Sequence, residues 1–271
     1  MSRLPILMYH SISSSSNPRF QQFAVPERAF AEQMAYLHEH HYVPMTVTQV
    51  AQARSMNVDA IPEQAVVLTF DDGFADFLTT ALPILQRYGF VATLYVTTAY
   101  VGQTSQWLQH EGEAERPMLT WEQLRTVCSS GIECGGHTHS HPQLDVLPLQ
   151  LAREEIWQCK HVLEEQLAQE ISSFAYPYGY QTAAVRKLVQ GAGFHSACAV
   201  KNRMSTERDD PFAIARLMVG ADLSLQEFVS VLTGQNQSPA TVLSQLYARS
   251  RTPVWQIVRR GTKAIAQRQK K

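Results

Sequence analysis

Short apolar segments rich in β-branched residues alternate along the chain with longer segments in which apolar residues recur at helical spacing. The clearest strand signal is the continuous apolar run at residues 66–70. A helix over about residues 26–40 is predicted from the i, i+4, i+7 recurrence of Phe30, Met34 and Leu37. This alternation is typical of parallel β/α units in which helices cover the faces of the sheet.

The same periodicities predict the remaining elements and give seven or eight strands in total. Further strands are predicted at residues 6–9, 91–96, 132–134, 174–176, 196–200 and 217–219. Further helices are predicted at residues 79–88, 149–169 and 182–191, and from the Thr120/Gln123 capping box to about Val127. Polar and charged residues gather directly after strands, which is where β/α barrels build their active sites.

Size and composition fit one α/β domain with a large core. The 271 residues are 45% hydrophobic and 17% charged, and 13 Gly and 13 Pro are too few for a disordered or collagen-like chain. A change in composition at residues 234–239 suggests a boundary. We therefore predict a catalytic domain over residues 1–233 and a basic, helical tail over residues 234–271.

The net charge of −1 conceals an uneven distribution. Eight basic and no acidic residues follow Glu227, so the rest of the chain carries −9. Trp255, Val258, Thr262 and Ile265 form an apolar stripe flanked by Arg and Lys. Such a helix suits either an anionic membrane surface or packing against the barrel. We expect no nucleic-acid partner for this basic tail.

The compartment is predicted from what the printed sequence lacks. The N-terminal apolar run is about four residues, whereas a signal peptide needs 7–15. The four cysteines have no CxxC spacing and are interpreted as free thiols in a reducing compartment. We expect a cytoplasmic protein, with peripheral attachment to the inner membrane if the tail binds lipid.

Two adjacent carboxylates, Asp71 and Asp72, follow the strand at residues 66–70. Side chains alternate in direction along a strand, so one carboxylate can bind a metal while the other reaches a bound water. The competing interpretation is an ordinary Asp-Asp-Gly turn.

Three histidines lie within five residues after the next pair of glycines. His137 and His141 are four residues apart and can converge on one ion, whereas His139 between them is expected to point away. Two imidazoles and the Asp72 carboxylate leave open positions on a metal, as in catalytic zinc sites. In that arrangement Asp71 acts as general base toward a water made more acidic by the ion.

A third segment, residues 174–179, places aromatic residues around Pro177 and Gly179. We interpret it as a groove wall for a sugar ring, with the Tyr178 amide donating to a developing oxyanion. A packed turn with buried aromatic residues is the alternative.

In this order the three segments resemble the polysaccharide deacetylases, the NodB-homology domain of carbohydrate esterase family four. Thr69 to Asp72 resembles the family's first motif, His137 to His141 its second, and Pro177-Tyr178-Gly179 part of its third. The opening residues 5–11 resemble the branch that contains the poly-N-acetylglucosamine deacetylases. The resemblance covers roughly residues 4–220.

The resemblance implies an α/β fold, a distorted (β/α)7 barrel, and metal-dependent removal of an acyl group from a sugar. It implies Asp71 as base, the Tyr178 amide as oxyanion donor, and a divalent metal, with zinc expected. The implied metal ligands are Asp72, His137 and His141.

Two departures from the family pattern concern groups that assist the base and the leaving amine. Ala175 stands where the third motif has an arginine that orients the base, and Arg216 is the candidate substitute. No histidine follows His195, so the usual Leu-x-His acid is missing and His10 is the candidate proton donor. A surface role for Arg216 and a structural role for His10 are the alternatives.

Two functions are consistent with these motifs. The leading one is an enzyme that deacetylates an N-acetylhexosamine in a surface polysaccharide, a lipopolysaccharide or a lipid-linked glycan precursor. The alternative is a catalytically silent carbohydrate-binding or assembly module, which the two departures favour and the complete metal and base set disfavours.

Overall fold

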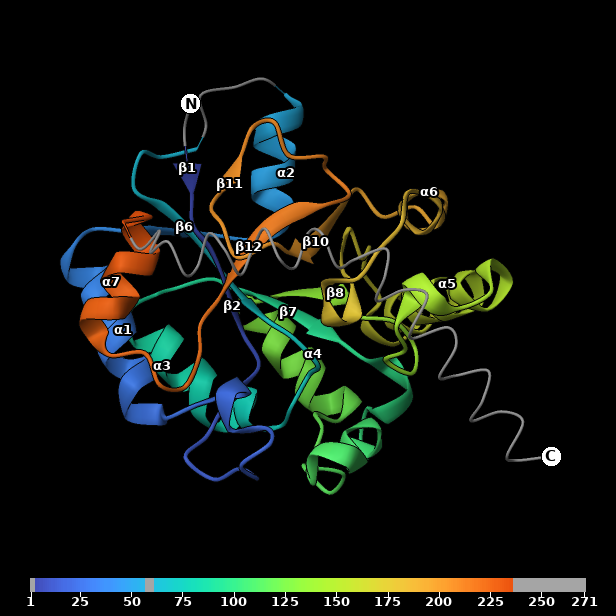
Figure 1. The fold of residues 1–271 in the computed structure, drawn as a ribbon, viewed down its shortest axis with the longest axis horizontal. Coiled ribbons are helices and arrows are strands. Elements are labelled where there is room, and N and C mark those ends of the chain that lie inside the picture. The colour runs from blue at the N-terminus through green and yellow to red at the C-terminus, as the bar shows by residue number, and fades with distance from the viewer. Residues whose placement is uncertain (1–2, 57–60, 236–271) are drawn as a thin grey trace.

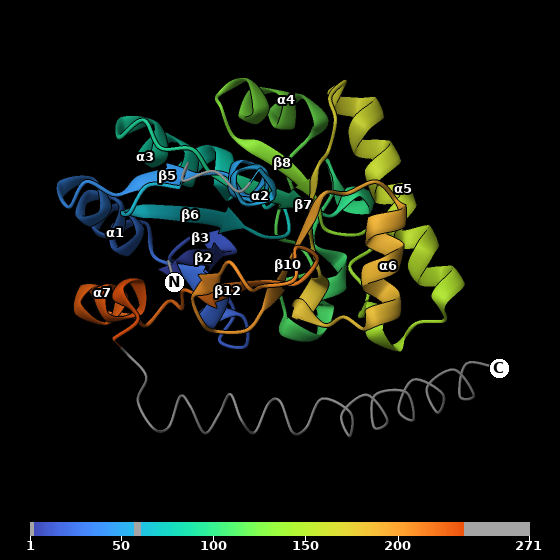
Figure 2. The ribbon, with the colours of Figure 1, turned by 90° about the horizontal axis from the view of Figure 1, so that it is seen from above.

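Seven parallel strands close into a barrel surrounded by helices (Figures 1 and 2). The structure is a computed structural model that describes residues 3–56 and 61–235. Going round the barrel, the strands are β2 (Ile6–Tyr9), β6 (Ala65–Phe70), β7 (Thr93–Val96), β8 (Glu133–Gly136), β9 (Ser173–Ala175), β10 (Ser196–Val200) and β12 (Ile214–Met218). The expected distorted (β/α)7 barrel is therefore confirmed.

The remaining elements surround or extend the barrel. The α-helices are α1 (Glu27–Glu39), α2 (Val47–Ser55), α3 (Leu82–Arg87), α4 (Trp121–Ser129), α5 (Leu149–Leu167), α6 (Ala183–Gly191) and α7 (Leu225–Thr233). The short strands are β1 (Arg3–Leu4), β3 (Ser11–Ile12), β4 (Ala24–Val25), β5 (Val43–Met45) and β11 (Ser205–Thr206). The short helical segments are η1 (Gln21–Phe23), η2 (Phe77–Ala81, a π-helix), η3 (Thr98–Tyr100), η4 (Gln106–Glu111), η5 (Leu144–Val146) and η6 (Pro177–Gly179).

Pairing of β2 with both β6 and β12 closes the barrel. Leu7 lies beside Leu68 of β6 and beside Leu217 of β12, and both pairings are parallel. On the opposite side of the barrel the strand pairing is shorter, because β8 and β9 share the single pairing of Gly136 with Phe174. This uneven closure is the distortion of the barrel.

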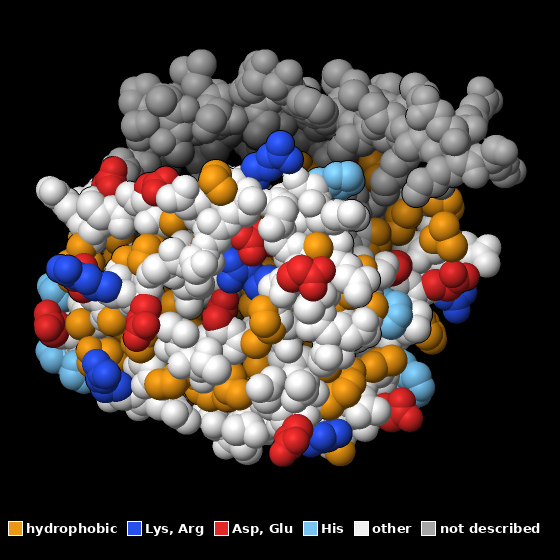
Figure 3. All heavy atoms as spheres, turned by 90° about the horizontal axis from the view of Figure 1, so that it is seen from below, with side chains coloured by type: hydrophobic (Ala, Val, Ile, Leu, Met, Phe, Trp, Pro, Cys, Tyr) orange, Lys and Arg blue, Asp and Glu red, His pale blue; other side chains and the backbone are white. Residues whose placement is uncertain are grey.

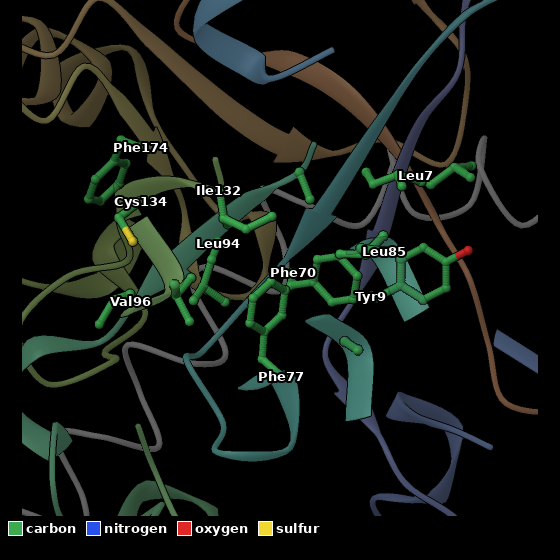
Figure 4. Close-up of a cluster of buried hydrophobic side chains, with 14 of the residues drawn as sticks. Leu7, Tyr9, Phe70, Phe77, Leu85, Leu94, Val96, Ile132, Cys134 and Phe174 are labelled. Atoms are coloured by element: carbon green, nitrogen blue, oxygen red, sulfur yellow. The ribbon is translucent and has the colours of Figure 1, made fainter. Parts of the chain in front are cut away.

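Alternation along the strands sorts side chains into two cores. One face of each strand packs against the helices, and Figure 4 shows the part of that core around Phe70 and Phe77. The other face fills the barrel interior near the amino ends of the strands, in a cluster that includes Ile6, Val67 and Tyr95. Val47 and Val50 of α2 join this second cluster and help to close that end of the barrel.

The carboxyl ends of the strands point toward the bottom of Figure 1, where long loops surround them. Inward positions near these ends carry His10 after β2, Asp71 after β6 and His137 after β8. The alternation that buries apolar residues at the amino ends of the strands thus directs polar side chains into the carboxyl end of the barrel.

Most predicted elements are present, with three corrections. The late strand spans Ile214–Met218 rather than residues 217–219, so Arg216 lies in its middle. The strand predicted at residues 132–134 spans Glu133–Gly136 and so includes both glycines, where Tyr95 and Phe194 leave little space for a β-carbon. The helix expected at residues 79–88 begins earlier, with the π-turn at Phe77–Ala81.

The basic tail predicted from the sequence lies outside the described residues from position 236 onward. The membrane-binding hypothesis for Trp255 and its neighbours, and the domain boundary at residue 233, therefore remain predictions. Among the helices of the described residues, none is long and apolar enough to cross a lipid bilayer.

Adding one methyl group at Gly135 is predicted to destabilise the barrel. A β-carbon there would lie 2.6 Å from the Tyr95 ring and 2.8 Å from Ser173 Oγ. Overpacking of this kind costs about 1–3 kcal/mol, which urea denaturation of Gly135→Ala should show. Gly191→Ala is the control, because a β-carbon at the end of α6 meets no atom within 4 Å. Equal stability of the two variants would contradict this description of the barrel wall.

Candidate metal centre and active site

Three potential metal ligands converge at the carboxyl ends of β6 and β8. Ligand atoms of Asp72, His137 and His141 all lie within 4.8 Å of one another, and all three residues are buried. Asp72 Oδ1 is 3.4 Å from His137 Nε2 and 3.1 Å from His141 Nε2. The three ligands named from the sequence are therefore brought together by the fold.

The orientation of His137 is set by the neighbouring strand. Its Nδ1 lies 2.8 Å from the backbone carbonyl oxygen of Ala175 in β9. A carbonyl can only accept, so Nδ1 carries the proton and Nε2 presents its lone pair toward Asp72. Backbone support of this kind fixes the imidazole tautomer that a metal requires.

The loop that brings His141 back to the site is held from outside by α5. Both carboxylate oxygens of Glu155 accept hydrogen bonds from Ser140, one from its backbone N–H and one from its hydroxyl. The His141 N–H donates to Thr138 Oγ1 at 3.0 Å. His139 points away from the ligands, with Nδ1 2.9 Å from Thr98 Oγ1.

The backbone is left-handed at four non-glycine positions around the site. The φ angles are 79° at Asp72, 67° at Thr138, 60° at His141 and 60° at Tyr178. Each such residue costs of the order of 1–3 kcal/mol and persists only where its surroundings impose it. Strain of this kind gathers at functional sites, and here it coincides with two of the three ligands.

The donor set fits a divalent cation. Asp72 Oδ1 is fully buried yet accepts no well-formed hydrogen bond from the described residues. Burial alone would raise the pKa of Asp72, but His141 and His137 outweigh it and hold that pKa well below its usual range. An ionised, otherwise unpaired carboxylate oxygen facing two imidazole nitrogens is consistent with a divalent metal site.

Asp71 points in a different direction and is held by Arg216. The guanidinium donates to Asp71 Oδ1 at 2.6 Å and to Oδ2 at 2.8 Å, and it also reaches Thr69 Oγ1 at 3.1 Å. Burial raises the pKa of Asp71, but Arg216 and then His137 lower it, and the net shift is downward. Asp71 is therefore a fixed, ionised carboxylate beside the metal ligands.

His10 and Tyr178 complete the set of residues named from the sequence. His10 lies at the end of β2, half-buried, with its ring centroid 5.0 Å from that of Phe23. Burial lowers the pKa of His10, although Asp72 and Asp71 act in the opposite direction. The exposed Tyr178 ring packs edge-on against His141 at 4.9 Å.

A pocket of about 250 Å³ opens onto these groups. Asp71, Asp72, His10, His137 and His141 form its polar part. Its remaining lining is apolar or aromatic and consists of Met8, Phe20, Phe23, Trp107, Leu108, Tyr178, Tyr180, Val200 and Met218. Seen from below, acidic and basic side chains gather near the centre of this face, with hydrophobic side chains around them (Figure 3). Such a pocket suits a ligand with apolar faces and few polar anchors.

Two of the loops that line the pocket are tied together by Arg116. Its guanidinium donates to Ser11 Oγ and to the Ser15 carbonyl oxygen, each at 3.0 Å. It also forms ion pairs with Asp76 at 3.4 Å and Glu113 at 2.9 Å. Since only 9% of the Arg116 side chain is exposed, this network fixes the loops around Phe20 and Trp107.

Several pocket residues were missed by sequence reasoning. Trp107, Phe20 and Phe23 lie in connecting segments with no strand or helix periodicity, so no pattern singled them out. Met218 was not identified because the predicted strand at residues 217–219 is too short to show which of its side chains point inward. Continuing the inward alternation of β12 from Ile214 through Arg216 would have identified it.

Comparison with known proteins relates the chain to one protein family. The model of the family described as "Polysaccharide deacetylase" matches residues 59–197. The chain is 29% identical over 227 residues to YxkH of Bacillus subtilis, a relative named for the same family, covering 83% of this chain and 75% of YxkH. It is 25% identical to the poly-β-1,6-N-acetyl-D-glucosamine N-deacetylase of Escherichia coli over 88% of this chain, but it spans only 40% of that protein's length.

Solved structures share the fold over most of the chain. The deacetylase PplD of Streptococcus pyogenes, in complex with acetate, superposes with a TM-score of 0.73 at 25% identity, covering 85% of this chain and 98% of PplD. IcaB from Ammonifex degensii superposes with the same TM-score at 24% identity, covering 86% and 97% of the two chains.

The ligand set predicts that each chain binds one divalent cation and that changing His141 weakens this binding. His141→Gln removes one of the two imidazole ligands and should weaken metal binding by at least about 10-fold, as measured by isothermal titration with Zn²⁺. His139→Gln is the matched control in the same loop, because its side chain faces Thr98. Equal loss of binding in both variants would show that loop folding, rather than ligation, accounts for the effect.

Proposed function

The chain belongs to the polysaccharide deacetylase family, and we propose that it removes the N-acetyl group from an N-acetylhexosamine unit of a glycan by metal-dependent hydrolysis. The observation that carries the proposal is the buried Asp72, His137 and His141 set with the arginine-bound Asp71 beside it. The substrates we propose are a surface polysaccharide, a lipopolysaccharide or a lipid-linked precursor of either.

Asp72, His137 and His141 would hold the metal, and we propose zinc because one carboxylate and two imidazoles suit it. When bound, the ion supplies Lewis acidity that polarises the acyl carbonyl and lowers the pKa of water. The three protein ligands leave positions for substrate and water, as in catalytic rather than structural sites.

Asp71 is the proposed general base. Its carboxylate is ionised and accepts two hydrogen bonds from Arg216, so its position is defined before the substrate binds. It removes the proton from the attacking water as the oxygen bonds to the acyl carbon. Arg216 thereby takes the part that the family motif gives to an arginine at the position of Ala175.

The backbone N–H of Tyr178 is the proposed donor to the carbonyl oxygen, which becomes an anion in the tetrahedral intermediate. The left-handed φ of 60° at Tyr178 sets the direction of the neighbouring peptide units. The ring of Tyr178 lies 6.1 Å from that of Tyr180 and nearly parallel to it, and both are partly exposed. These rings offer apolar faces to a sugar, which supports a carbohydrate substrate.

His10 is the proposed donor of the proton that the leaving amine needs. It lines the same pocket as Asp71 and Asp72, which supports this assignment. Because burial lowers its pKa, its protonated form is populated on the acid side of neutrality.

The alternative is a silent carbohydrate-binding module, and the missing motif arginine was one of the two observations in its favour. The contact of Arg216 with Asp71 supports assigning the role of that arginine to Arg216 and so favours the enzyme. Binding alone requires neither a base nor open metal positions, so an amine-release assay separates the two functions.

Asp71→Asn is predicted to abolish deacetylation while the protein stays folded and keeps its metal. The amide cannot accept the proton, and loss of a general base costs at least about 10²-fold in rate. The assay is acetate and amine release from a series of N-acetylated oligosaccharides and lipid-linked sugars. Unchanged activity in the variant would refute the proposed base, and absence of activity in the wild type on every substrate would favour the binding module.

His10→Gln is predicted to remove one limb of the pH profile. A general acid works only when protonated, so wild-type kcat should fall as the pH rises through the pKa of His10, below its ordinary 6.5. The variant should lose about 10²-fold in kcat and show no such fall. A variant that retains the same limb would exclude His10 as the donor.

A further inference from the structure

Two cysteines face each other on the outside of the barrel, away from the metal site. Cys128 lies in the last turn of α4 and Cys134 in β8, and their sulfur atoms are 3.0 Å apart. Both are free thiols. Six positions along the chain separate them, and the turn between α4 and β8 brings them together.

The two sulfur atoms have different surroundings. Cys128 is partly exposed, its sulfur is hydrogen-bonded to that of Cys134, and it accepts a hydrogen bond at 3.4 Å from Gln169 Nε2. The hydrogen bond between the two sulfur atoms lowers the pKa of Cys128 more than burial raises it. The same bond, together with burial, raises the pKa of Cys134. One sulfur is thus the accessible nucleophile and the other its protonated partner.

We propose that Cys128 and Cys134 form a redox-active dithiol that small aliphatic disulfides convert into an intramolecular disulfide. The Cys128 thiolate attacks one sulfur of the small disulfide, forms a mixed disulfide and releases one thiolate. The Cys134 sulfur then attacks Cys128 Sγ and releases the second thiolate, which takes up the Cys134 proton. The protein pair loses two electrons, and the small disulfide gains them as two thiols.

The other two cysteines provide an internal comparison. Cys159 and Cys198 are fully buried, and burial raises the pKa of Cys159 to about 12 and of Cys198 to about 11. Their sulfur atoms contact a backbone carbonyl and the Tyr95 hydroxyl, respectively, rather than another thiol. Both should stay unreactive while the protein is folded.

The proposed modification does not require the metal site and is independent of the proposed deacetylase activity. Cys134 packs in the core between barrel and helices. His137, three positions further along, points into the opposite face and lines the pocket. A disulfide would therefore tie α4 to the strand that precedes the metal ligand while leaving the ligand free.

The test uses the full chain in its folded state, incubated with oxidised glutathione and then alkylated after unfolding. Alkylatable thiols should fall from the four of the sequence to two. The tryptic peptide of residues 126–153, which contains both Cys128 and Cys134 and no internal Lys or Arg, should become lighter by two hydrogen atoms. Dithiothreitol should restore all four thiols.

Two serine variants separate the steps. Cys134→Ser should accumulate a stable glutathione adduct on Cys128, whereas Cys128→Ser should remain unmodified at Cys134. Circular dichroism checks that both are folded. A wild-type protein that keeps four thiols, or that retains the glutathione adduct as Cys134→Ser does, would overturn the proposal.

Discussion

The buried pair of Asp71 and Arg216 is the interaction on which the arrangement of the site depends. Its partners are 145 positions apart in the sequence, at the end of β6 and in the middle of β12. Neither strand pairs with the other, because β2 lies between them. Breaking a buried pair by removing one partner costs about 3–5 kcal/mol, so the pair and the closure of the barrel support each other. The bidentate contact neutralises two buried charges, and it also fixes the orientation of the Asp71 carboxylate, the proposed base.

The position of this arginine follows from how the barrel interior is filled. Tyr95 occupies the space beside Gly135, and the Arg216 guanidinium stacks over the Tyr95 ring at 5.5 Å. Ala175, on β9, contributes only a methyl group to the inner cluster. The family motif would place a large cation at that position, whereas here the cation enters from β12. In the proposed mechanism, Arg216 supplies from β12 the positive charge that orients Asp71.

Sequence reasoning found much of the fold because most strands are short, apolar and well separated. The strands at Ile6–Tyr9 and Ser196–Val200 were predicted with their observed ends. The Thr120/Gln123 capping box begins α4 as expected, since both of its hydrogen bonds are formed. By contrast, β5, α2 and α7 were not predicted. A three-residue strand containing Pro44 and a polar helix at Val47–Ser55 show too little periodicity.

The site was predictable where chemistry and spacing coincide, and unpredictable where it depends on tertiary packing. Asp72, His137 and His141 were identifiable because ligand-type residues cluster after strands. The tautomer of His137 depends on a carbonyl of β9, and the position of Trp107 depends on loops joined through Arg116.

The most direct test of the central claim is the activity of Arg216 variants at full metal occupancy. Arg216→Lys keeps the charge but cannot form the bidentate contact with Asp71. The account predicts that this variant binds one zinc per chain with wild-type affinity but deacetylates at least about 10²-fold more slowly, because the base is no longer held in place. Wild-type kcat in a folded, metal-loaded Arg216→Lys protein would contradict it.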